Sequence, residues 1–195
     1  MSVRPPRRLS KDARREQLVS AAMPIVAEQG FGEFSLEAIA DEADVTRNLL
    51  YHYFPRGRQD VVLAVVERAG RELSSQWVLD EDLPLSARLA ANFDRMMSHA
   101  LAPSDAWRIH RKARATGDPE IDKIVAAYSE KVIASISLNH LGTPKPSRLA
   151  HLALTGFIAY AEAALDEARI TRAPRKRVIK LLSDTLVGTI QAASG

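Results

Sequence analysis

The sequence contains no cysteine, which excludes disulfide bonds and thiol chemistry and suits a reducing compartment. It has no apolar run long enough to cross a membrane, and its basic N-terminus has no continuous apolar stretch of the kind a secretory signal needs. It also lacks a Gly-rich phosphate loop, a nucleophile elbow and an i, i+4 histidine pair with a glutamate. We therefore expect a soluble, cytoplasmic, non-catalytic protein without cofactor or metal.

The net charge is also small, at +3, and does not by itself indicate a nucleic-acid partner. The charge is unevenly distributed, because six basic residues crowd the first fifteen positions and Asp12 is the only acid among them. We expect residues 1–9, rich in Pro and Arg, to form a disordered basic tail. Such a tail can lie along DNA phosphates or enter a narrow minor groove, or it can serve solubility alone.

Apolar residues recur at helical spacing in segments that Pro and Gly separate, and strand patterns are hard to find. The sequence therefore predicts an all-α fold, with one substantial core or a small domain joined to a larger one. Besides two short helices within 35–54, we expect helices at residues 10–29, 59–76, 84–101, 106–116, 119–141, 147–168 and 174–192. Pro24 should bend the first of them.

Residues 35–54 read SLEAIADEADVTRNLLYHYF, a pattern of two short helices and a tight turn. Leu36, Ile39 and Ala40 share one face of the first helix. Ser35 and Thr46 are placed to cap the two helices with their hydroxyls. Asp44, in the turn, can take the left-handed backbone conformation at modest cost. This arrangement is a helix-turn-helix.

The second short helix has polar side chains on the face opposite its apolar stripe of Leu49, Leu50 and Tyr53. That face carries Arg47, Asn48, Tyr51 and His52. Arginine binds guanine edges or phosphate, asparagine pairs with adenine, and the other side chains reach phosphate oxygens or a thymine methyl. The pattern favours insertion into a DNA major groove, although a solvated helix face also carries Arg and Asn.

The stretch AIADEADVTRNLLYHYF resembles the second and third helices of the tetracycline-repressor (TetR) family of bacterial regulators. The resemblance extends upstream over residues 15–34 and downstream into the helix after Arg58. It implies a three-helix DNA-binding domain at 10–57 and a larger helical domain for effector binding and dimerisation at 58–195. We expect DNA contacts from Ser35, Thr46, Arg47, Asn48, Tyr51, His52 and Arg58.

Three departures from the family pattern concern this domain. Asp44 and Asn48 stand where Gly is common, and both residue types tolerate unusual backbone angles. The loop over residues 55–58 is longer than the usual form. Arg58 replaces the usual Lys.

The resemblance also implies an inducer pocket in the larger domain, with apolar walls and a few polar groups. The helix at 59–76 would transmit effector binding to the recognition helices. The candidate lining residues are Phe93, Met96, Met97, Trp107, His110, Arg114, Tyr128, His151, Thr155 and Phe157. From the residues alone, aromatic and Met stripes of this kind are more often plain core, residue by residue, than the wall of a pocket.

A homodimer is expected because one short recognition helix covers too few bases, whereas two related by symmetry address a palindrome. The family forms its dimer through a four-helix bundle of the last two helices of each copy. We expect interface contacts from Ala153, Tyr160, Ala164, Leu182 and Leu186. Small and aliphatic faces of this type also suit intramolecular packing.

Two other interpretations stay open at this point. The chain could be a non-catalytic helical module that binds acidic protein or membrane through Arg108, Arg111, Lys112, Arg114, Arg175, Lys176, Arg177 and Lys180. A His110–His151 pair could serve a metal or acid–base chemistry if the fold brings the two rings together. The operator, the effector, the regulated genes and the sign of regulation are not encoded in any recognisable residue.

Overall fold

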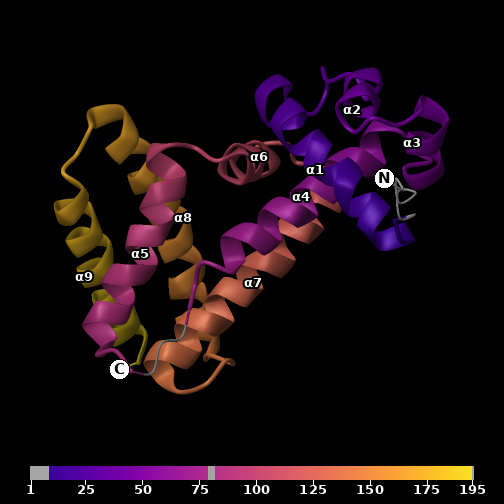
Figure 1. Ribbon diagram of the computed structural model, residues 1–195. Coiled ribbons are helices and arrows are strands. Elements are labelled where there is room, and N and C mark those ends of the chain that lie inside the picture. Colours follow the sequence, from indigo (N-terminus) through magenta and orange to yellow (C-terminus); the bar gives the residue numbers. More distant parts are fainter. Residues whose placement is uncertain (1–8, 79–81, 195) are drawn as a thin grey trace, which may run out of the picture.

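The computed structural model describes residues 9–78 and 82–194, and all regular structure in this part of the chain is helical (Figure 1). The helices are α1 (Lys11–Gln29), α2 (Leu36–Glu42), α3 (Arg47–Tyr53), α4 (Arg58–Ser74), α5 (Leu85–Leu101), α6 (Asp105–Ala113), α7 (Pro119–Leu141), α8 (Arg148–Thr171) and α9 (Arg175–Ser194). The all-α prediction is confirmed. None of the helices over these residues is long and apolar enough to span a membrane. The predicted basic tail lies outside the described residues except for Leu9.

Side-chain caps mark four of the helix starts. Ser10, Ser104 and Ser147 each accept a hydrogen bond from the backbone N–H three residues later, which satisfies a donor that the first helical turn leaves free. Asp118 caps α7, and Pro119 occupies its first position. The cap signals in the sequence therefore located these four starts to within about two residues.

The helix ends were predicted less well. The sequence placed the end of α8 at residue 168, but the helix continues to Thr171 and closes where Arg172 takes a left-handed backbone angle (φ 53°). Conversely, α6 ends at Ala113, three residues before the predicted end. α1 runs through Pro24, which lies on the exposed side of the helix, and the bend expected there stays a prediction.

Buried side chains form two clusters. The first joins α1, α2, α3 and α4 to one side of α6 and the start of α7, and includes Val62 and Val65 of α4. The second joins α5, α7, α8 and α9 to Trp107 of α6. Helix α6 therefore contributes to both clusters. The division of the chain at residues 57 and 58 stays a prediction, since α4 packs mainly with the cluster on its N-terminal side.

Helices α4 and α7 run side by side and connect the two halves of the molecule (Figure 1). Their approach is close at Gly70, where a Cβ atom would lie 2.2 Å from Cδ2 of Tyr128. The Tyr128 ring thus lies against the backbone of α4, and the Lys131 ammonium covers it at 4.3 Å from the ring centroid. Tyr128 fixes the spacing between these two helices.

Gly70→Ala should destabilise the fold by about 1–3 kcal/mol, because the new methyl group would force the Tyr128 ring and α7 away from α4. In an isolated helix the same change would stabilise. Urea denaturation at fixed protein concentration measures the difference. In a Tyr128→Ala background the destabilisation should disappear, and an equal destabilisation in both backgrounds would contradict this account.

Candidate DNA-binding site

The α2–turn–α3 unit has the predicted local geometry. Ala38 N–H donates to Ser35 Oγ (3.2 Å) and Leu49 N–H donates to Thr46 Oγ1 (3.3 Å), so both expected caps form. Asp44 has a φ of 50°, in the left-handed region. Around it, Asp44 N–H donates to the Asp41 carbonyl (3.1 Å) and Val45 N–H to the Ala40 carbonyl (2.9 Å). These two bonds end α2 and set the angle at which α3 leaves it.

A small core holds α3 in place. Phe34, Leu50 and Phe54 are almost fully buried, and Phe31 and Tyr53 pack against them from partly exposed positions, as predicted. Leu49, expected in the same stripe, is only half-buried. Two further contacts from α1 support the unit: Gln17 Nε2 donates to the Ala43 carbonyl (2.9 Å), and the Arg15 guanidinium lies 5.6 Å from the Phe54 ring centroid.

The outer face of α3 exposes Arg47, Asn48, Tyr51 and His52, as the sequence predicted. Arg47 is held on two sides, because its Nη1 lies 2.5 Å from Glu37 Oε1 and its Nη2 donates to the Tyr51 hydroxyl (3.3 Å). The side chains of Asn48 and His52 have no hydrogen-bond partner among the described residues. They are free to bind an external group.

Glu37 is a carboxylate that sequence reasoning did not include in the site. Its own backbone N–H and the Ser35 hydroxyl donate to it, and with the charges of Arg47 and Arg58 these bonds lower the pKa of Glu37. The carboxylate is therefore ionised and orients the Arg47 guanidinium. Ser35, predicted as a DNA contact, uses its hydroxyl twice within the chain, as donor to Glu37 and as acceptor from Ala38.

A groove of about 570 Å³ lies beside this face. Its polar lining comes from α2, α3, the loop before α4 and the start of α4: Glu37, Arg47, Tyr51, Arg56 and Arg58. The four residues besides Glu37 are hydrogen-bond donors. Such a lining suits phosphate oxygens. Arg47, Tyr51 and Arg58 were predicted DNA contacts, whereas Arg56 was not, although it lies in the lengthened loop over residues 55–58.

The loop arginines are fixed by neighbours from other elements. Arg58 Nη1 donates to the Gly32 carbonyl (3.2 Å), and its guanidinium lies over the Phe34 ring. Arg56 binds Asp60 (2.7 Å) and reaches across to Glu120 at the start of α7 (3.0 Å). The end of the recognition helix is therefore tied to α7 as well as to α4.

The predicted effector residues do not form one pocket, and this prediction needs correction. Phe93 and Met97 expose none of their surface, and Trp107 and Phe157 only 4%, because they pack in the second cluster. Of these four, Trp107 lines a groove of about 370 Å³ between α6 and α8, away from the other three. Met96 packs against the same cluster, and Tyr128 lies against Gly70 as described above.

Three of the ten predicted effector residues do meet. Arg114, His151 and Thr155 line a pocket of about 350 Å³ beside α7, together with apolar groups that include Val125 and Ile133. His151 binds Glu130 (2.9 Å), whereas His110 binds Glu162, so each ring has its own carboxylate. No group of three or more potential metal ligands occurs over residues 9–78 and 82–194.

Glu162 of α8 is the centre of the junction between α6 and α8. It is only 5% exposed, yet three side chains of the α6 segment bind it: His110 Nε2 (2.9 Å), Arg111 Nη1 (3.0 Å) and Arg114 Nε (3.1 Å). Burial by itself would raise the pKa of Glu162, but the His110 hydrogen bond and the neighbouring charges hold that pKa below its ordinary value. His110 and Arg114 are thus partly committed to this junction.

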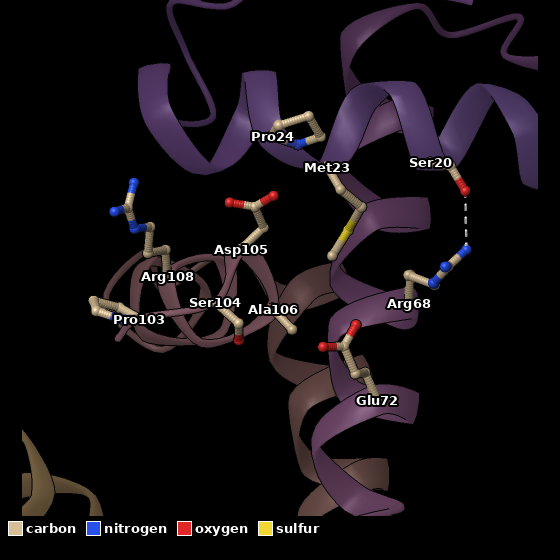
Figure 2. Close-up of a pocket in the computed structure, with 10 residues that line it drawn as sticks. All are labelled: Ser20, Met23, Pro24, Arg68, Glu72, Pro103, Ser104, Asp105, Ala106 and Arg108. Carbon is tan, nitrogen blue, oxygen red and sulfur yellow. Dashed lines mark hydrogen bonds between the residues drawn. The ribbon is translucent and has the colours of Figure 1, made fainter. Parts of the chain in front are cut away.

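On its other side, α6 faces α1 and α4. Figure 2 shows the groove of about 490 Å³ at this boundary, where Met23 and Pro24 of α1 face the start of α6 across from Glu72 of α4. None of its lining residues was predicted as an effector contact, and Arg108 was named only for the alternative basic module. Beyond the groove the contact closes, because Lys112 Nζ donates to the carbonyls of Ala27 (2.8 Å) and Glu28 (3.3 Å) at the end of α1. Helix α6 is therefore bonded to both halves of the molecule.

The predicted dimer residues separate into buried and exposed groups. Leu182 and Leu186 expose none of their surface, since they point into the second cluster, and a contact with another chain is a wrong assignment for both. Ala153 and Ala164 are partly buried, and Tyr160 is 40% exposed. The apolar side chains that do lie open on these helices are Leu149, Leu152 and Ile170 of α8 and Leu181 of α9.

Comparison with known proteins agrees with this geometry. Residues 18–65 match the family described as bacterial regulatory proteins, tetR family. The HTH-type transcriptional regulator LuxR of Vibrio harveyi is 31% identical over 105 residues, which cover 53% of this chain and 51% of that protein. The HTH-type transcriptional repressor KstR of Mycobacterium tuberculosis is 28% identical over 146 residues, covering 69% and 61% respectively. The chain thus spans about half to three fifths of these curated relatives.

A solved structure extends the likeness to the whole fold. The crystal structure of a tetR-family transcriptional regulator from Streptomyces coelicolor has a TM-score of 0.78 to this chain at 24% identity, covering 95% of this chain and 84% of that one. Residues 18–65 of this chain thus match the TetR family in sequence, and its fold is similar to that of a solved TetR-family regulator over 95% of the chain.

Proposed function

We propose that this protein is a transcriptional regulator that binds a palindromic DNA operator as a homodimer and releases it when a small molecule binds. The observation that carries the proposal is the outer face of α3, where Asn48 and His52 are exposed without hydrogen-bond partners beside an arginine-lined groove. Repression is the proposed direction, by analogy with the relative named as a repressor.

In this proposal α3 enters the major groove. Arg47, aimed by Glu37 and Tyr51, would bind a guanine edge, and Asn48 would pair with adenine. Arg56 and Arg58 would hold the adjoining phosphates, which fixes the register of α3 without reading sequence. Thr46 and His52 flank the same face and would reach the backbone of the duplex.

The proposed dimer uses the open face of α8 and α9. Leu152 is 68% exposed and Leu181 51%, and a Cβ atom on Gly156 or Gly188 would meet nothing within 4 Å. Small residues between exposed leucines allow helices of a second copy to approach closely, which suits a four-helix bundle. Tyr160, Ala153 and Ala164 lie on or beside this face and remain in the proposed interface, whereas Leu182 and Leu186 do not.

The proposed effector site is the pocket that Arg114, His151 and Thr155 line. Arg114 also binds Glu162, so an effector that presents an acceptor group to Arg114 would compete with that carboxylate. Weaker bonding of Glu162 would loosen α6 from α8. Because α6 packs on α1 and α4, the helix-turn-helix would then move relative to the dimer bundle.

Several of the basic residues proposed for the alternative, a module that binds acidic partners, already have partners within the chain. Arg111 and Arg114 bind Glu162, Lys112 binds the end of α1, Arg175 binds Asp94 (2.6 Å) and Lys180 binds Asp184 (2.7 Å). These cations serve intramolecular contacts.

Selection from random duplexes at near-physiological salt should enrich an inverted repeat. Arg47→Ala or Asn48→Ala should then weaken binding to that repeat by about 1–3 kcal/mol for each half-site, because each removes hydrogen bonds to a base. Arg148→Ala, an exposed arginine on α8, is the control and should bind normally. Failure of folded wild-type protein to enrich any sequence would reject the proposed function.

Leu152→Glu should shift the protein from dimer to monomer, because it places a charge in the centre of an apolar interface. Light scattering at micromolar concentration measures the mass. Leu138→Glu makes the same change at a leucine of α7 that is 41% exposed, and it should leave the dimer intact. A monomeric wild-type protein, or a dimeric Leu152→Glu variant, would argue against this interface.

Glu162→Gln should lower the free energy of unfolding at pH 7 by roughly 1.5–3 kcal/mol, because three charge-assisted bonds lose their carboxylate. Since the folded pKa of Glu162 lies below the ordinary 4.5, its contribution is present above that pH and is lost as the pH falls through the folded pKa. The gap between wild type and variant should therefore close in acid. Glu167→Gln, exposed on the same helix, should show no such gap.

A further inference from the structure

Five exposed basic residues near the α8–α9 turn take part in none of the contacts described so far. The side chains of Arg108, Arg169, Arg172, Lys176 and Arg177 make no hydrogen bond, ion pair or ring contact with the described residues. We name these five residues the cationic patch. Charge runs on helices are usually either solvated singly or paired, so an unpaired group of five indicates an external partner.

Nearby acids do not neutralise the patch. Asp166 is bound by Arg111 (2.7 Å) and by the Trp107 indole N–H (3.2 Å), and Asp94 is bound by Arg175. Glu167 is the one exposed acid between residues 163 and 180. On α6, Asp105 lies three residues before Arg108 and its side chain also makes no hydrogen bond or ion pair with the described residues, so five cations stand near two unengaged carboxylates.

The fold brings the patch together from three helices. Arg108 of α6 and Arg169 of α8 line one groove of about 370 Å³, with Arg111 and Asp166 between them. Arg172, Lys176 and Arg177 follow in the turn from α8 to α9 and the first turn of α9. In Figure 1 this turn, α6, α2 and α3 lie along the upper side of the molecule, with the turn at the left and α3 at the right, while the turn between α7 and α8 lies on the lower side.

We propose that the cationic patch binds phosphates of the operator segment between the two half-sites, an inference that rests on the proposed function. Two recognition helices address half-sites about one helical turn, roughly 34–36 Å, apart, so the duplex between them passes the dimer axis. Four of the five patch residues lie at the α8–α9 turn, where the two helices of the proposed dimer face meet, and a dimer formed through that face would bring this turn close to its axis. The two copies together would place both patches there, and the phosphates of the intervening DNA would relieve the repulsion between them.

Phosphate contacts of this kind add affinity and salt dependence without reading bases. The double variant Arg169→Gln/Lys176→Gln removes two patch cations from each copy. Its matched control is Lys145→Gln/Arg148→Gln, which removes one exposed lysine and one exposed arginine from the opposite end of the molecule. Both variants are compared with wild type on the selected operator over a range of salt concentrations.

The patch variant should bind the operator more weakly than wild type does. Its slope of log K against log salt should fall by about 0.9 for each phosphate that is no longer neutralised, up to about 3.6 per dimer. The control should keep the wild-type slope. Neutral methylphosphonate linkages between the half-sites should weaken wild-type binding but weaken the patch variant much less.

Equal slopes for wild type and patch variant, or an equal methylphosphonate effect on both, would overturn the inference while the proposed function stands. Loss of binding to phosphatidylglycerol vesicles in the patch variant, with an unchanged operator slope, would overturn it in favour of a membrane surface. If the wild-type protein binds no duplex specifically, both the proposed function and this inference fail. That outcome differs from failure of the inference alone, because no operator is recovered.

Discussion

The structure depends on a carboxylate that is costly to bury. Glu162 lies almost entirely out of solvent, where an unpaired charge would be destabilising by several kcal/mol, and only the three polar side chains of the α6 segment make its position tolerable. Removing any of them leaves the charge less compensated. The pairing therefore holds α6 against α8 at one position and gives the junction a definite geometry.

Because α6 is fixed in this way, it connects two packed bodies that otherwise meet mainly along α4 and α7. Ala106, Ile109 and Ala113 fill the first cluster, and Trp107 fills the second. Lys112 adds a bond to the end of α1. A change at Glu162 that displaces α6 would therefore also displace α1 and α4, which contact α6 directly and support the helix-turn-helix. The side chain that would sense an effector in the proposed mechanism, Arg114, is one of the groups that bind Glu162.

Whether a basic residue is paired within the chain distinguishes structural from candidate binding residues, which the net charge does not do. The net charge of +3 is small, but many of the arginines are neutralised inside the chain by Glu37, Asp60, Asp94, Glu162 and Asp166. The helices that carry the cationic patch and the recognition helix lie along the same side of the molecule, at its left and right in Figure 1. The groove beside α3 and the cationic patch could therefore both face one extended polyanion.

Sequence by itself determined what depends on neighbours a few residues apart. The helix-turn-helix could be predicted in detail because caps, the left-handed Asp44 and the apolar stripe of α3 are all set by local spacing. Helix starts followed from Ser and Asp caps for the same reason. The exposure of Arg47, Asn48, Tyr51 and His52 followed from helical periodicity.

Only the tertiary structure decided which of two apolar stripes on α8 and α9 faces inward and which aromatic residues are core. Leu182 and Leu186 resemble interface residues until α5 and α8 cover them, and Phe93 and Met97 resemble pocket walls until the second cluster closes around them. The role of Glu162 and the link from Arg56 to Glu120 were equally invisible, since these partners lie about 50 to 65 positions away in the sequence. Long-range pairing of charges and choice of buried face are properties of packing between helices, which no local pattern specifies.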